Sequence, residues 1–174
     1  MPSFISHAVA ATGIAAPFYR PGVPRRLLIV GAAFAAMPDL DAIGFWLGVP
    51  SGGLFGHRGI THSLSFAVVL ATTTVALRYR KGAGPLGPGL VWLFLLLATA
   101  SHGLLDTLTD GGRGVALLAP FSLERFVAPV RPIAVSPIGF HGVLSLRGLR
   151  IAGTELLVIW LPSAAAWGAR LLAK

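Results

Sequence analysis

The stretch GLVWLFLLLATASHGLLDTL, residues 89–108, decides the fold class. A membrane-spanning helix needs roughly 20 largely apolar residues, and this stretch meets that length while carrying His102 and Asp106 only near its end. Four other apolar runs accompany it, at residues 4–18, 27–49, 63–79 and 154–172. The first of them is short, and the second is interrupted by Pro38, where we expect a kink or break. The runs predict an all-α integral membrane bundle of four to five helices.

The composition also indicates a membrane protein. Of the 174 residues, 55% are hydrophobic and 11% are charged, whereas soluble domains carry about 25% charged residues. The net charge of +8 would suggest nucleic-acid binding in a soluble protein. Here the basic residues lie in short clusters between apolar runs, as in polytopic membrane proteins, so we expect contact with the lipid bilayer and no nucleic-acid partner. The length favours a single domain, residues 1–174, and the absence of cysteine excludes disulfides and thiolate metal sites.

The basic residues predict an orientation. If all five runs cross, segments 18–26 and 78–88 and the C-terminal tail share one side and carry eight basic residues. The opposite side carries six, spread over 48–62 and 109–153. Basic residues in short loops mark the cytoplasmic face, so we expect 109–153 to be an extracytoplasmic loop or lid. The first run lacks the basic start of a signal peptide, and we expect it to be retained.

This threading brings most of the histidines and aspartates to one face of the membrane at about one depth. The set contains four of the five histidines and three of the four aspartates: His7, Asp39, Asp41, His57, His62, His102 and Asp106. Imidazole and carboxylate together suit Zn²⁺, Mn²⁺ or Fe²⁺, and the lack of thiolate favours a catalytic site over a closed structural one. Seven candidate ligands exceed what one tetrahedral ion needs, so two or three ions could be held.

His102 and Asp106 are four residues apart, so they project from the same face of a helix. This is the spacing by which one helix offers two ligands to a metal. Gly111 and Gly112 predict that the helix ends shortly after Asp106, whose carboxylate then faces the negative end of the helix dipole. A bound cation would remove that penalty. The alternative is a His–Asp hydrogen bond that caps a buried helix end.

Asp39 and Asp41 follow Pro38 inside an apolar run. On an extended segment the two carboxylates point to the same side, whereas on a helix they diverge by roughly 200°. Irregular backbone at membrane depth is tolerated where it is buried in protein or lines a cavity. The sequence leaves two interpretations open, a pair of ligands at a break in the helix and a solvated junction between helix and loop.

The segment HRGITHS, residues 57–63, is a turn that contains glycine and leads into the third run. His57 and His62 are candidate ligands because they lie beside the other histidines and aspartates. In the alternative interpretation they are bystanders, and the segment only caps the following helix through Ser63 or Thr61.

Four other charged residues have two interpretations each. Arg58 follows His57 and could bind a substrate phosphate through two hydrogen bonds, or be an ordinary loop arginine. Arg125 and Arg131 lie among prolines and aromatics in 120–137, which could form a lid or an interfacial skirt. Glu155 could face the same cavity, but we favour a position at a helix N-terminus, where acidic residues are stabilising.

The motifs PDLD, HRGITHS, SHGLLDTLTDGG and the later PFSLERF…PI…SPIG resemble the LexA-regulated, inner-membrane metal-dependent hydrolase family. The resemblance runs from His7 to about Glu155, and it implies a membrane-bound hydrolase in a bacterial inner membrane. The order of ligand types is also distantly similar to that of the zinc-dependent phospholipase C and P1 nuclease group. That likeness implies zinc, held by His7, Asp39 or Asp41, His57, His102 and Asp106. The group has a further His and a second HxxxD pair, whereas only His141 follows here, so one or two ions are expected.

The leading hypothesis is a membrane-bound metal-dependent hydrolase that uses metal-activated water on a phosphoester or related ester, including lipid or lipid-linked substrates. Arg58 would orient the substrate anion, and His62 would be a weaker ligand or the general base. The expected metal ligands are His7, Asp39, Asp41, His57, His102 and Asp106. One alternative is a transport or metal-handling protein, which would carry His and acidic residues at several depths. The other is a non-catalytic membrane scaffold.

Overall fold

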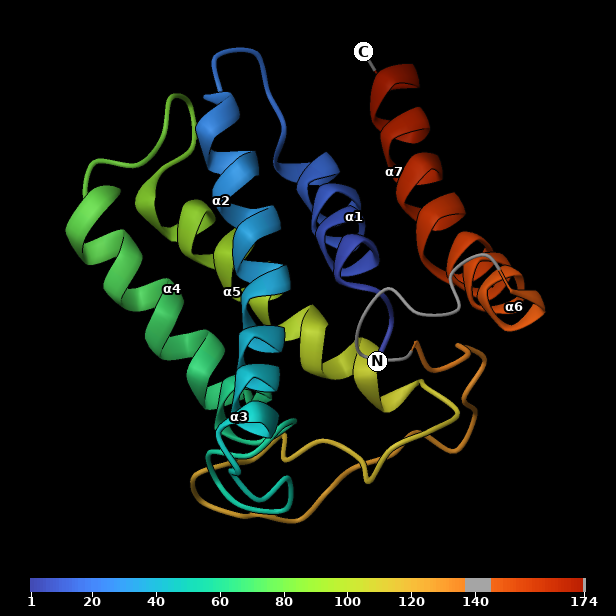
Figure 1. Ribbon diagram of the computed structural model, residues 1–174. Helices are drawn as coiled ribbons and strands as arrows, with labels where there is room; N and C mark the ends of the chain where they lie inside the picture. The colour runs from blue at the N-terminus through green and yellow to red at the C-terminus, as the bar shows by residue number, and fades with distance from the viewer. Residues whose placement is uncertain (137–144, 174) are drawn as a thin grey trace.

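The computed structural model describes residues 1–136 and 145–173. Within these residues the chain is helical, with isolated backbone bridges and no strand. The helices stand side by side and run between two ends of the molecule (Figure 1). Three stretches in the described part are long and apolar enough to cross a bilayer: Arg25–Trp46, Pro88–Thr107 and Leu146–Leu172. The predicted all-α membrane bundle is confirmed.

Two shorter apolar helices, Phe4–Phe18 and Leu64–Arg78, complete the bundle. In chain order the elements are α1 (Phe4–Ala15), η1 (Ala16–Phe18), α2 (Arg25–Ala36), η2 (Met37–Ala42), α3 (Ile43–Trp46), η3 (Ile60–His62), α4 (Leu64–Arg78), α5 (Pro88–Thr107), α6 (Leu146–Glu155), η4 (Leu156–Trp160) and α7 (Leu161–Leu172). The first three η elements are 3-10 helices, and η4 is a π-helix.

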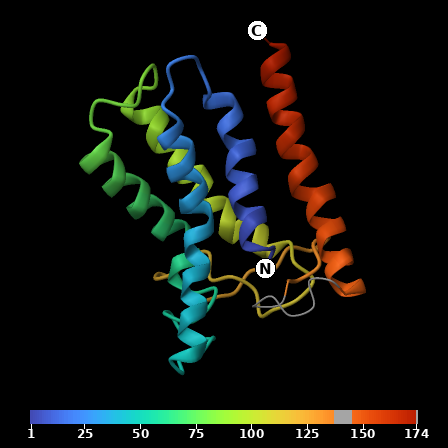
Figure 2. The same cartoon turned by 45° about the horizontal axis from the view of Figure 1, so that its top comes forward.

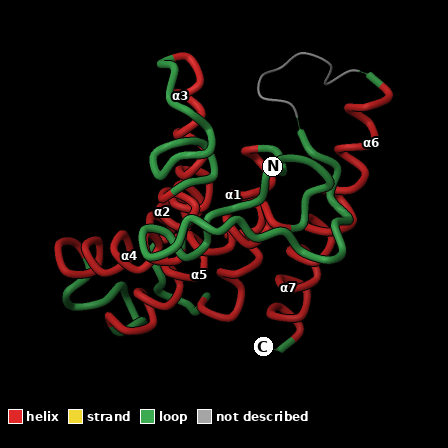
Figure 3. The backbone as a smooth tube through the Cα atoms, turned by 90° about the horizontal axis from the view of Figure 1, so that it is seen from below, coloured by secondary structure: helices red, strands yellow, loops and turns green. Residues whose placement is uncertain are grey.

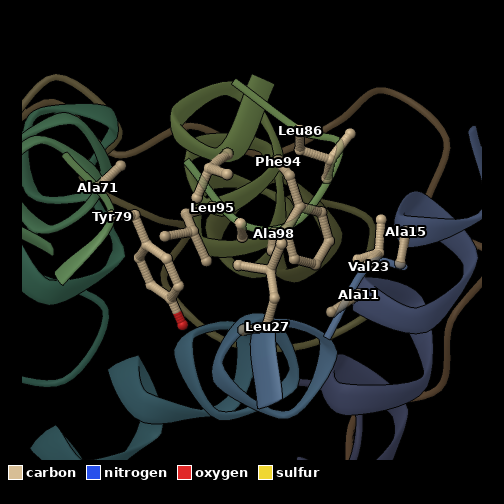
Figure 4. Packing of buried hydrophobic residues seen from close by; sticks show 13 residues of the cluster. Ala11, Ala15, Val23, Leu27, Ala71, Tyr79, Leu86, Phe94, Leu95 and Ala98 are labelled. Atoms are coloured by element: carbon tan, nitrogen blue, oxygen red, sulfur yellow. The ribbon is translucent and has the colours of Figure 1, made fainter. Parts of the chain in front are cut away.

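The hydrophobic core lies among α1, α2, α4 and α5, as Figure 4 shows. α5 contributes Phe94 and Leu95, and α2 contributes Leu27, all almost fully buried. Gly31 of α2 permits the ring of Phe94 to approach the backbone, because a Cβ at this position would overlap the ring. In lipid there is little hydrophobic drive between helices, so close packing of this kind holds them together.

The α-helical geometry of α2 ends at Ala36, as the proline that follows predicts. Pro38 has no backbone N–H, and its ring crowds the carbonyl four residues earlier, which disfavours a continued α-helix. The chain instead forms the 3-10 helix η2. This tighter turn buries Asp39, while Asp41 faces the 57–62 segment and accepts hydrogen bonds from it. The interruption expected at Pro38 is thus observed, in the form of a 3-10 turn.

The last helix begins at Leu146. That is eight residues before the apolar run 154–172 and inside the segment 109–153, which we expected to be loop or lid. The difference arises because leucines alternate with Arg147 and Arg150 in α6, so no continuous apolar run marks its start. Residues 146–153 are therefore helix and not loop.

Glu155 connects this last helix to the start of α1. Its carboxylate accepts hydrogen bonds from the backbone amide and hydroxyl of Ser3 and from the hydroxyl of Ser6. Ser3 is the N-cap of α1, so the carboxylate lies at the positive end of the α1 dipole. Glu155 therefore sits at a helix N-terminus, but at that of α1 and not at that of its own helix. Through this contact α6 positions the turn that carries His7.

Replacing Glu155 with alanine is expected to lower the midpoint of thermal unfolding in detergent by at least about 4 °C. The substitution leaves buried donors without an acceptor, at a cost of about 1–3 kcal/mol for each unsatisfied group. Glu155→Gln keeps one acceptor oxygen and should cost less. The exposed Glu124 provides the control Glu124→Ala. Equal midpoints for the two alanine variants would show that the contact does not stabilise the fold.

The two ends of the bundle differ in their connections. The links from α1 to α2 and from α4 to α5 are short and lie at the same end as the C-terminus (Figure 1). The N-terminus and the longer connections lie at the other end (Figure 2). Seen from below, these connections spread across the helix ends (Figure 3). This division of short and long connections is the one that the threading predicted.

Candidate metal centre

Five buried side chains meet at the end of the bundle with the long connections. They are 0–8% exposed and come from four elements: His7 from α1, Asp39 from η2, His62 from η3, and His102 and Asp106 from α5. The two residues of α5 share a face because they are four residues apart. His7 and His62 reach the same place because α1 and η3 pack against α5. Asp39 does so because η2 continues α2, which also packs against α5, and contacts η3.

Four candidate ligand atoms are connected by short distances. Nε2 of His102 lies 3.0 Å from Nε2 of His62 and 3.3 Å from Oδ1 of Asp39. Nε2 of His62 lies 3.7 Å from the same Asp39 oxygen and 3.6 Å from Oδ2 of Asp106. Ligand atoms bound about 2.1 Å from a tetrahedral zinc ion are roughly 3.4 Å apart. The observed distances therefore suit neighbouring ligands of one ion.

Two groups of three residues satisfy the distance requirement of a metal site among the described residues. One group is His7, His102 and Asp106, and the other is Asp39, His57 and His62. In each group, one ligand atom per residue lies within 4.8 Å of the other two. The contact between His62 and His102 joins the groups. These distances thus meet the requirement of one ion or of two neighbouring ions.

The tautomer of His102 follows from its hydrogen bond to the backbone. Its Nδ1 lies 2.6 Å from the carbonyl oxygen of Ala35, which can only accept, so Nδ1 carries the proton. Ala35 lies in the last turn of α2, where a helix leaves carbonyls without intrahelical partners. The lone pair of Nε2 therefore points toward His62 and Asp39. A histidine held in this way by its second nitrogen is typical of metal ligands.

Asp41 orients the 57–62 segment. Its Oδ1 lies 2.6 Å from Nδ1 of His57, and its Oδ2 accepts hydrogen bonds from the backbone of Arg58 and the hydroxyl of Thr61. The same Oδ2 lies 3.1 Å from Nδ1 of His62. Asp41 thereby directs the other nitrogen of His62 toward His102. The structure gives Asp41 the position of a residue that holds a ligand in place.

The charge state of His62 depends on its carboxylate neighbours. Burial by itself lowers the pKa of His62, but contacts with Asp39 and Asp41 outweigh burial and raise the pKa to about 9. Without a metal ion, His62 therefore holds a proton at neutral pH, and Nε2 directs it at His102. Since a metal ligand must be deprotonated, ion binding here would release that proton.

Several buried polar atoms of the centre have no hydrogen-bond partner among the described residues. They include both ring nitrogens of His7, both carboxylate oxygens of Asp39 and Oδ1 of Asp106. His7 stacks on His102 with ring centroids 3.7 Å apart, and its Nε2 lies 3.6 Å from Asp106 Oδ1. Burying a carboxylate whose oxygens accept no hydrogen bond is costly. A divalent cation would satisfy these atoms together, so the residues present fit a metal ion.

Arg58 forms an ion pair with Asp106. Its Nε lies 2.9 Å from Oδ2 of Asp106, and its terminal nitrogens donate to the carbonyl of Gly111 and the hydroxyl of Thr109. Gly112 makes room for the guanidinium, because a Cβ there would overlap it. Arg58 thus contacts a candidate ligand, and its expected role toward a substrate anion stays a prediction.

The structure brings all eight residues that the sequence singled out to one end of the bundle. They are His7, Asp39, Asp41, His57, Arg58, His62, His102 and Asp106. His141 lies outside the described residues. Sequence reasoning missed the carbonyl of Ala35, which has no signature in the sequence, and the hydroxyls of Thr61 and Thr109. Thr109 follows Asp106 by three residues in the same motif. This spacing was the one feature of the sequence that could have indicated its role.

The fold and this buried cluster define a helical membrane protein with a candidate metal centre near one end of its bundle. The family model described as YdjM inner membrane protein matches residues 1–174, and the chain belongs to this family. It is also 40% identical over 164 residues to the Inner membrane protein YbcI of Escherichia coli (strain K12). The matched region covers 93% of this chain and 92% of YbcI. No solved structure matches the chain significantly. Regulation by LexA and the relation to the phospholipase C and P1 nuclease group stay predictions.

Proposed function

We propose that this inner-membrane protein is a metal-dependent hydrolase that cleaves a phosphoester or related ester. One observation carries the proposal: three histidines and two aspartates from four elements are buried together, and many of their ligand atoms have no other partner among the described residues. Histidine and carboxylate ligands without thiolate are typical of catalytic zinc sites. Zn²⁺ is the proposed ion, with Mn²⁺ and Fe²⁺ as alternatives.

His7, Asp39, His62, His102 and Asp106 would hold the metal. When bound, a divalent ion supplies polarisation of a phosphoester oxygen and activation of a water nucleophile. The backbone of α2 keeps His102 in the required tautomer through its hydrogen bond to Nδ1. Such supporting contacts contribute about 10–100-fold to metal affinity.

We further propose that the centre opens on the extracytoplasmic side. The short connections, the helix ends beside them and the C-terminal segment carry eight of the 14 basic residues of the sequence. The short connections lie at the opposite end (Figure 1), and basic residues in short loops mark the cytoplasmic face. A site at the membrane surface favours lipid or lipid-linked esters as substrates.

The proposal is tested by elemental analysis of the detergent-purified protein together with phosphoester hydrolysis. We expect at least about one equivalent of zinc, manganese or iron, loss of the metal and of hydrolysis on chelation, and recovery of both when the ion is restored. Protein that is shown to be folded but takes up none of these ions would contradict the proposal.

A structural metal site is the second candidate, because the ligand side chains are at most 8% exposed, as in closed structural sites. The two candidates differ in what chelation does to folding. A structural site predicts that the metal-free protein unfolds or loses much of its thermal stability. A catalytic site predicts that the metal-free protein stays folded and loses hydrolysis alone.

A further inference from the structure

A cavity of about 250 Å³ lies beside the candidate metal centre. Its lining includes His57, which contacts the supporting residue Asp41, and Arg58, which contacts Asp106 of the centre. Two more arginines, Arg113 and Arg125, also line it. Basic side chains thus reach one hollow from the 57–62 segment and from two parts of the loop that follows α5. Arg113 is not among the residues that the sequence pattern singles out for the site.

The basic side chains of the cavity outnumber the carboxylates that act on them, which are Asp106 at Arg58 and, without an ion pair, Asp41 at Arg125. Arg125 donates hydrogen bonds to the backbone carbonyls of Ser51, His57 and Gly114, which position its guanidinium but do not neutralise it. Neither Arg113 nor Arg125 forms an ion pair with any residue in the described ranges. Burial, followed by the charges of Arg113 and Arg58, lowers the pKa of Arg125. An anion in the cavity would relieve this repulsion.

We propose that this cavity binds the phosphate group of the substrate through Arg113 and Arg125, next to the metal centre. The inference rests on the proposed function and names its substrate class, a phosphate-bearing ester. Arginine suits this role because its planar group of N–H donors matches phosphate oxygens through pairs of hydrogen bonds. Arg58, whose charge is matched by Asp106, forms the boundary between the cavity and the metal centre.

The size of the cavity limits what it can enclose. Pockets for drug-sized ligands have volumes of about 300–1,000 Å³, so this one admits a phosphate with a small attached group and leaves the rest of a larger substrate outside. Arg113 is exposed, which gives the anion access from solvent or from the membrane surface.

Arg113→Gln is the decisive variant, because Arg113 lines the cavity and forms no ion pair with a described residue. Arg131→Gln is the matched control, since Arg131 is exposed, lies in the same loop and does not line the cavity. Binding of inorganic phosphate and of dioctanoyl phosphatidic acid is measured by calorimetry in detergent, with metal content and thermal midpoint determined on the same samples. We expect Arg113→Gln to weaken binding of both probes by at least about tenfold, and Arg131→Gln by less than about twofold.

The relative affinity of the two probes identifies the source of the phosphate. Phosphatidic acid bound more than about tenfold tighter than inorganic phosphate indicates a lipid headgroup, and similar affinities indicate recognition of phosphate alone. Equal binding by Arg113→Gln and Arg131→Gln, or wild-type protein that binds neither probe, would overturn the inference. Metal content is a separate readout: protein that binds phosphate through Arg113 but takes up no metal would refute only the hydrolase.

Discussion

The His102→Ala variant is expected to lose more than about 100-fold in metal affinity and to show no hydrolysis above background. Removing a residue that supports a ligand already costs about 10–100-fold, and His102 is a candidate ligand whose Nε2 lies 3.0 Å from His62 and 3.3 Å from Asp39. The measurement is titration of chelator-treated protein with Zn²⁺ in competition with an indicator of known affinity. Elemental analysis of the protein as purified checks the result independently.

The neighbouring residue provides the control for this variant. Ser101 precedes His102 on α5, and its hydroxyl donates to the carbonyl of Ala98 within the same helix. Ser101→Ala should therefore keep wild-type metal affinity. His102→Ala with unchanged zinc affinity, in folded protein, would remove the main support for a centre built on α5.

Gly103→Ala is expected to destabilise the protein and weaken metal binding at the same time. Alanine in place of glycine normally stabilises a helix interior, by about 1 kcal/mol. At Gly103, however, the new Cβ would overlap the backbone carbonyl oxygen of His62 and press on Leu117. The 3-10 turn η3 must then move away from α5, and His62 moves away from His102. We expect the thermal midpoint to fall by at least about 4 °C and zinc affinity by at least about tenfold.

Gly168 is the matched control for this effect. It lies inside the helix α7, and a Cβ added there would meet nothing within 4 Å. Gly168→Ala should therefore raise the thermal midpoint or leave it unchanged, as helix propensity alone dictates. If Gly103→Ala behaves like Gly168→Ala, then the close approach of η3 to α5 is not needed for either stability or metal binding.

The fold was largely predictable from the sequence because it depends on long apolar runs. Residues 89–108 correspond closely to α5, and the interruption at Pro38 corresponds to η2. The start of the last helix was missed because α6 alternates leucine with arginine. Length and apolar content do not detect such an amphipathic helix.

The site was predictable only as a set of residues. Threading the runs brought the histidines and aspartates to one end, but it could not divide them into candidate ligands and the residues that hold them. Asp41 and Asp39 look equivalent in the motif PDLD, and only the 3-10 geometry turns one toward the centre and the other toward His57. The partner of Arg58 was likewise hidden, because Asp106 lies 48 positions away along the chain.

The bond between Glu155 and Ser3 has a consequence for the order of assembly. His7 is the first candidate ligand to leave the ribosome, yet the carboxylate that holds its helix turn follows almost 150 residues later. During synthesis the four earlier apolar helices can enter the bilayer before α6 exists. The centre can therefore reach its final geometry only after the last helix inserts and the carboxylate of Glu155 reaches α1. A ribosome-bound intermediate that ends before α6 would contain every candidate ligand but not the completed site.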